Sequence, residues 1–249
     1  MRQGLKEAFI FKWQKYFVTS GYPVAYFYSN EVSVNGIKES MNQERCLIGN
    51  LNQVRDGKTF VYSSKSPGCA GGKRYAGFTR TLRPNFEYFL SCGLPGKMEG
   101  ERYKKTPELV NNYLKDNPPF EAEGKYMVFK RWDKLNDAEQ PAAVIFFATP
   151  DVLSGLFTLA NYDSPDPHAV IAPMGSGCSS IIAYPMVEAK SDRPRCVLGM
   201  FDVSARPSVP KNTLTFTIPE KRFEQMIENM DESFLITASW ENVQQRLEK

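Results

Sequence analysis

The sequence contains a single histidine, His168, and no Cys-x-x-Cys motif in its 249 residues. Zinc sites usually combine cysteine and histidine ligands at short spacings, so this composition argues against a local zinc site. A lone histidine also removes most metallohydrolase schemes, which need several imidazole ligands. We expect His168, in the proline-rich segment SPDPHAV, to be a solvated loop residue.

The chain also lacks an excess of charge of one sign and a long apolar run. Its 31 basic and 28 acidic residues give a net charge of +3, which does not indicate a nucleic-acid partner. No stretch reaches the roughly 18 apolar residues of a membrane span, and Lys12 and Lys15 interrupt the N-terminal apolar run. We therefore expect a cytoplasmic protein without a membrane segment, in which the five cysteines remain free thiols.

The residues that are present predict alternating strands and helices. Residues 5–17 repeat apolar side chains every four residues, as in an amphipathic helix that ends near Gly21. Residues 21–31 and 141–151 favour buried strands, and Thr106 is a helix cap before 107–116. Near the C-terminus a strand at 212–219 precedes two helices. We expect one α+β or α/β domain over 1–249, with a mixed sheet and flanking helices.

An internal repeat would divide this unit into related halves, 21–120 and 141–249. Each half opens with Pro-x-Ala in its strand and later carries a Gly-Cys pair, at Cys69 and Cys178. A tyrosine follows each cysteine six residues later, Tyr75 and Tyr184. A second pair of similar segments is RCLIG at 45–49 and RCVLG at 195–199. The first precedes Cys69 and the second follows Cys178, and this difference in order argues against a simple duplication.

Glycines accompany most of the cysteines. Cys69, Cys92 and Cys178 each have an adjacent glycine, and Gly49 follows Cys46 closely. Iron–sulfur clusters take thiolate ligands and are tuned by backbone N–H groups that approach sulfur, which glycine permits. We predict an iron–sulfur cluster or another thiolate-bound metal, with a redox or electron-transfer role and with the ligands Cys46, Cys69, Cys92 and Cys178. A redox partner or a small molecule would be its counterpart. None of the spacings resembles a compact ferredoxin motif, so distant loops would have to converge.

Three motifs resemble a known family. They are GCAGGKRYAGF at 68–78, FLSCGLPGKMEGERYKK at 89–105 and GSGCSS at 175–180, with Cys46 before them. This arrangement is similar to the uncharacterised archaeal cysteine-rich family known as domain of unknown function 169. The resemblance covers nearly the whole chain and implies that Cys46, Cys69 and Cys178 match shared positions. Cys92 is typical of only some members, Cys196 has no place in the pattern, and no reaction comes with the family.

Two other functions remain open. The turn GSGCSS offers backbone N–H groups and hydroxyls to a phosphate or carboxylate, with Arg206 or Arg102 as a counter-charge. This metal-free reading predicts ligand contacts from Gly175, Ser176, Gly177, Ser179, Ser180 and Arg206. Alternatively, a helix that begins at Cys178 or Ser179 would activate Cys178 as the nucleophile of an enzyme. Pro185 would lie in the second turn of that helix, which predicts a kink or a restart.

Overall fold

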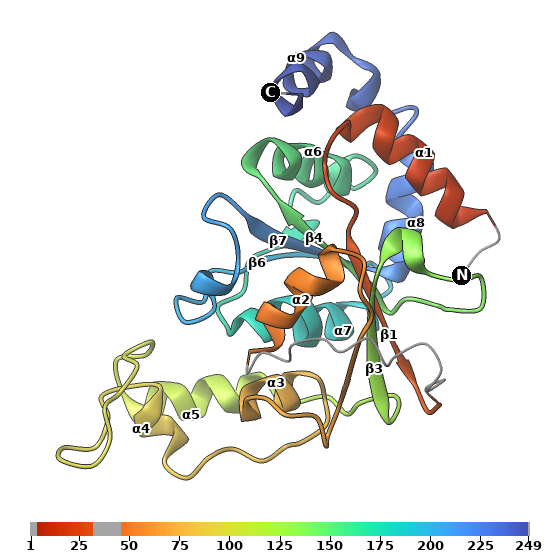
Figure 1. Ribbon diagram of the computed structural model, residues 1–249. Helices are drawn as coiled ribbons and strands as arrows, with labels where there is room; N and C mark the ends of the chain where they lie inside the picture. The colour runs from red at the N-terminus through yellow and green to blue at the C-terminus, as the bar shows by residue number, and fades with distance from the viewer. Residues whose placement is uncertain (1–3, 32–45, 249) are drawn as a thin grey trace.

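A seven-stranded sheet forms the centre of the molecule in a computed structural model, which describes residues 4–31 and 46–248 (Figure 1). The strand order is β2-β3-β1-β4-β7-β6-β5. All neighbouring strands are antiparallel except β5 and β6, which pair in parallel. The mixed α+β fold predicted from the sequence is therefore confirmed. The strands are β1 (Val24–Ser29), β2 (Phe60–Ser63), β3 (Tyr126–Arg131), β4 (Ala143–Ala148), β5 (Val170–Ile171), β6 (Cys196–Gly199) and β7 (Leu214–Pro219).

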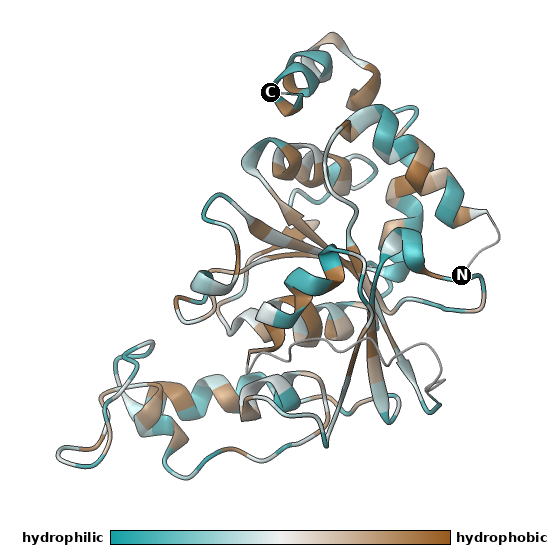
Figure 2. Cartoon of the chain, in the orientation of Figure 1, coloured by the Kyte–Doolittle hydropathy of each residue, from teal (hydrophilic) through white to brown (hydrophobic). Residues whose placement is uncertain are grey.

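Helices cover both faces of this sheet, and each face has its own hydrophobic core (Figures 1 and 2). Side chains of β4 alternate between the two, since Val144 and Phe146 belong to one core and Ile145 to the other. The first core is covered by α1 (Leu5–Phe17), α6 (Pro150–Asn161), α8 (Glu220–Asn229) and α9 (Ala238–Leu247). The second is covered by α2 (Leu47–Arg55), the π-helical segment Ser179–Ala183 and α7 (Tyr184–Glu188).

Local sequence signals explain several of these helices. The apolar stripe of α1 is buried from Leu5 to Phe17, as the four-residue period predicts. Thr106 Oγ1 accepts a hydrogen bond from the Leu109 amide at 3.3 Å and caps α5 (Pro107–Asp116), also as predicted. The chain restarts its helix at Tyr184, which places Pro185 in the first turn of α7, where it needs no backbone donor.

A smaller layer lies beyond one end of the sheet, between β2 and β3 in the sequence. It contains α3 (Ala70–Tyr75), α4 (Phe86–Phe89) and α5, at the lower left of Figure 1. Short 3-10 helices complete the chain at Trp132–Lys134, Arg206–Ser208 and Phe234–Ile236. Among the described residues, no helix is long and apolar enough to cross a membrane.

The two proposed halves meet at the middle of the sheet, where β1 and β4 pair antiparallel. The helices that follow these two strands cover opposite faces, because α2 belongs to the second core and α6 to the first. A relation between 21–120 and 141–249 thus stays a prediction.

Candidate thiolate site

Three of the predicted cysteines lie at the start of a helical segment, Cys46 and Cys69 with extended backbone and Cys178 with helical backbone. Cys46 is the N-cap residue of α2, Cys69 is that of α3, and Cys178 directly precedes the π-helical segment. Amide groups in the first turn of a helix have no intrahelical acceptor and can donate to an anion or to sulfur. The Gly72 amide does so, with its nitrogen 3.2 Å from Cys69 Sγ.

The N-terminus of α2 lies between the other two cysteine segments. A methyl group placed on Gly72 would lie 3.5 Å from Cys69 Sγ and 3.6 Å from Cβ of Leu47, the neighbour of Cys46. On the other side, a methyl group on Gly177 would lie 3.5 Å from Cγ1 of Ile48. The structure therefore brings Cys46, Cys69 and Cys178 into one region, although they come from three separate segments.

The three thiols also influence one another electrostatically. Burial raises the pKa of Cys178 well above its ordinary value, and negative charge at Cys69, Cys46 and Asp202 raises it further. Cys178 is buried, Cys46 is half-buried and Cys69 is exposed. The site thus extends from the second core to the surface of the molecule.

Tyr62 on β2 adds a polar group to this region. Its side chain is 1% exposed, and its hydroxyl has no hydrogen-bond partner among the described residues. The same hydroxyl lies 3.0 Å from the methyl position at Gly72. Burial raises the pKa of Tyr62, and the charges of Cys178, Cys69 and Cys46 add to this effect. A buried hydroxyl without a partner costs about 1–3 kcal/mol. A hydrogen-bond acceptor bound beside Tyr62 would remove this cost.

The remaining two cysteines lie elsewhere. The Sγ of Cys92 is beside Ser91 and Gly93 in the loop after α4, which Figure 1 shows apart from α2 and α7. Cys196 is buried in the first core on the opposite face of the sheet, 3.8 Å from Met226 Sδ. The structure joins three of the four predicted ligands and does not place Cys92 with them. In the described part of the chain, no three His, Cys, Asp or Glu side chains stand in position to hold a single metal ion.

A family model, domain of unknown function 169, described as uncharacterised ArCR, matches residues 14–229. The chain belongs to this family. No curated protein and no solved structure matches. All three cysteines of the site lie within the region that the family model covers.

In this family member, groups of the protein itself accept hydrogen bonds from several donors of the GSGCSS turn. The Gly177 amide donates to Asp202 Oδ2 at 2.9 Å, and the Ser179 amide donates to Ser176 Oγ at 3.1 Å. The Ser180 hydroxyl donates to the Gly177 carbonyl at 2.9 Å, and Gly175 precedes this closed turn. Arg206 donates to the carbonyls of Pro210, Lys211 and Thr213, so its guanidinium closes its own loop.

Several tyrosines lie around the three cysteines, and the sequence did not predict them as part of the site. Tyr113 and Tyr184 hydroxyls lie 3.2 Å apart, which connects α5 with α7. Burial raises the pKa of Tyr75 to about 12, and the neighbouring Tyr113 contributes to the rise. Tyr75 and Tyr184 follow Cys69 and Cys178 at equal spacing, and this spacing was the sequence signal that could have placed them in the site. Tyr62 had no such signal, since it is one aromatic residue of a short strand.

His168 takes no part in this site. It is exposed, and its Nδ1 lies 2.8 Å from Asp166 Oδ1. This agrees with the loop role expected from the sequence.

Proposed function

We propose that Cys46, Cys69 and Cys178 bind an iron–sulfur cluster, and that the protein uses it for electron transfer or for redox chemistry on a small molecule. The observation that carries this proposal is the meeting of three cysteine segments beside the buried hydroxyl of Tyr62, which has no hydrogen-bond partner in the described part of the chain. The Gly72 amide supports it as well, because N–H donors to sulfur tune such clusters.

A cluster tolerates more widely spaced thiols than a single ion does. A tetrahedral zinc ion with bonds of about 2.3 Å holds its sulfur ligands only about 3.8 Å apart. The described residues contain no group that tight, whereas the charges of Cys46 and Cys69 still act on Cys178. A cluster attaches each cysteine to a different iron and so accommodates a wider set of thiols.

Three cysteines leave one iron of a four-iron cluster without a protein thiolate. That iron can take a substrate or another exogenous ligand, which suits an enzyme as well as an electron carrier. The Tyr62 hydroxyl could donate a hydrogen bond to the cluster or to such a ligand. The five free cysteines fit a reducing compartment, and we propose the cytoplasm.

The two alternative functions receive less support. A metal-free anion site would need the Gly177 amide, but Asp202 already accepts its hydrogen bond. A nucleophilic Cys178 would need a lowered thiol pKa and an exposed sulfur. Instead the residue is 7% exposed and burial raises its pKa.

Anaerobic purification tests the cluster proposal. The protein, reconstituted with iron and sulfide if necessary, should be brown and absorb broadly at about 400 nm. Iron and acid-labile sulfide should both be present at about four per chain, and reduction should give a paramagnetic resonance signal. Colourless protein that retains neither iron nor sulfide after reconstitution would contradict the proposal.

A further inference from the structure

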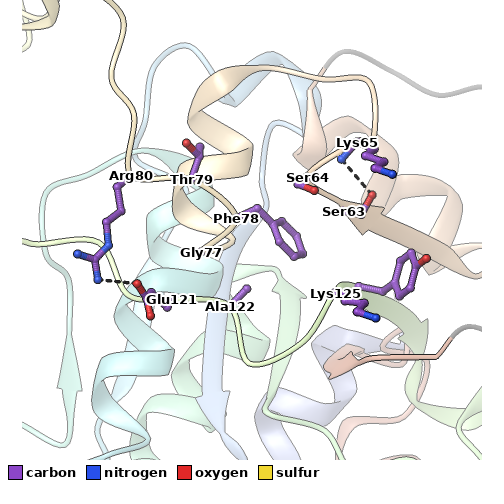
Figure 3. Close-up of a pocket in the computed structure, with 11 residues that line it drawn as sticks. Ser63, Ser64, Lys65, Gly77, Phe78, Thr79, Arg80, Glu121, Ala122 and Lys125 are labelled. Carbon is purple, nitrogen blue, oxygen red and sulfur yellow. Dashed lines mark hydrogen bonds and ion pairs between the residues drawn. The ribbon is translucent and has the colours of Figure 1, made fainter.

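A pocket of about 580 Å³ opens between the end of β2, the segment after α3 and the start of β3 (Figure 3). Ligand pockets of small molecules usually measure about 300–1,000 Å³, so its size suits a whole organic molecule. The side chains used below are Ser64, Lys65, Phe78, Thr79, Arg80, Glu121 and Lys125.

The charge of the pocket is positive. Arg80 pairs with Glu121 at 2.8 Å, and Glu121 is the one carboxylate among the lining residues. Lys65 and Lys125 add two further cations, which leaves the lining with a net charge of +2. The hydroxyl groups of Ser64 and Thr79 also line the pocket, on either side of Phe78, and can donate to an anion.

An aromatic ring forms the middle of the pocket. Phe78 points into the space between the cationic side chains (Figure 3). Its ring is held in place by edge contacts with Tyr62 and Tyr28, at centroid distances of 6.0 and 6.3 Å. The position of Phe78 is thus fixed by core residues, and the ring can stack on a flat ligand.

We infer that this pocket binds a small molecule that joins a flat ring to a phosphate or a carboxylate. The ring would stack on Phe78, and the acidic group would lie between Lys65 and Lys125. Tyr62 separates the pocket from the three cysteines, because its ring contacts Phe78 while its hydroxyl lies beside Cys69. Binding in this pocket does not require a cluster at the three cysteines.

Calorimetric titration with six probes tests this inference. Adenosine 5′-monophosphate carries a ring and a phosphate, and adenosine and inorganic phosphate are its separate halves. The probe 1-naphthoate carries a ring and a carboxylate, and 1-naphthylmethanol and acetate stand for its separate halves. At least one combined probe should bind tenfold or more tightly than either half, and the better one identifies the acidic group. If neither combined probe exceeds its parts, the inference is wrong.

Lysine variants locate the binding. Lys65→Ala and Lys125→Ala should each weaken the better probe by about tenfold, as expected for a lost charged hydrogen bond. Lys211→Ala is the matched control, since Lys211 is exposed and its side chain lies outside the pocket. Equal affinity of all three variants and the original protein would place the ligand elsewhere and overturn the inference. Iron and sulfide are assayed separately, so the failure of the cluster proposal leaves this result unaffected.

Discussion

The amide of Gly72 donates a hydrogen bond to Cys69 Sγ across 3.2 Å, within the first turn of α3. Because residue 72 has no side chain, the turn also approaches the buried hydroxyl of Tyr62, 3.0 Å from where a methyl group would be. The turn therefore brings the Cys69 sulfur and the Tyr62 hydroxyl, which has no partner among the described residues, to the same glycine. This arrangement gives the thiolate site its most specific predictions.

Tyr62→Phe should stabilise the metal-free protein but not the cluster-bound protein. Without metal, the variant should be more stable by about 1 kcal/mol, because it removes a buried hydroxyl that lacks a partner. With the cluster bound, this gain should disappear, since the hydroxyl then has an acceptor. Urea denaturation of the metal-free protein and thermal unfolding of both forms measure the difference.

Tyr28→Phe provides the control for that experiment. The Tyr28 hydroxyl already donates to the Ala76 carbonyl at 2.8 Å, so its removal should destabilise both forms by about 1 kcal/mol. A Tyr62→Phe gain that is equal in both forms would show that the hydroxyl has no role toward a bound group.

Gly155→Ala should destabilise the protein. The added methyl group would lie 2.4 Å from the ring of Trp240 and 2.9 Å from that of Phe17, both in the first core. Overpacking costs about 1–3 kcal/mol, against a helix-propensity gain of about 1 kcal/mol, so we expect a net loss of up to about 2 kcal/mol. Gly21→Ala, which meets no atom within 4 Å, should change the unfolding free energy by less than about 0.5 kcal/mol.

Asp163→Ala should be among the most destabilising polar substitutions. Both carboxylate oxygens of Asp163 accept from Arg222, whose side chain is buried in the α8 interface. Removal of the carboxylate leaves a buried guanidinium without its counter-charge, which should cost about 2–4 kcal/mol. Arg246→Ala, which breaks an exposed pair with Asp151, should cost less than about 1 kcal/mol in the same denaturation assay.

Asp231 should contribute to acid sensitivity. Hydrogen bonds from Tyr16, Lys12 and Lys15 lower its pKa from 3.8 to about 2. Because the folded state binds this proton more weakly, its contribution is complete above about pH 4 and is lost as the pH falls through about 2. Asp231→Asn should therefore flatten the fall of the thermal midpoint over that range, whereas exposed Asp137→Asn should leave it unchanged. An unchanged slope for Asp231→Asn would refute the assignment.

Capping residues and hydrophobic periodicity predicted the helices that depend on their own local sequence. The Thr106 cap and Pro107 marked the start of α5, and the apolar stripe marked α1. The segment Leu47–Arg55 has no comparable signal, and only its packing on the second core explains why it is helical. For the same reason no local signal predicted α6, although its buried face covers the first core.

The candidate site shows a different limit of sequence reasoning. Cys69 follows β2 at one edge of the sheet, and Cys178 lies between β5 and β6, which form the other edge. Their approach depends on the strand order and on α2 between them, and no local pattern encodes either. A glycine beside a cysteine also does not distinguish a site residue from a residue needed for close backbone packing. Next to Cys92 it serves backbone packing, because a methyl group on Gly93 would lie 2.5 Å from the Met98 carbonyl oxygen.

The iron and sulfide content of two cysteine variants tests the central claim most directly. Cys69 and Cys92 are both exposed and both have a neighbouring glycine, but only Cys69 lies with Cys46 and Cys178. After anaerobic reconstitution, Cys92→Ser should retain the iron and sulfide of the original protein, and Cys69→Ser should lose most of both. Equal retention by the two variants, or loss only from Cys92→Ser, would contradict a cluster bound by Cys46, Cys69 and Cys178.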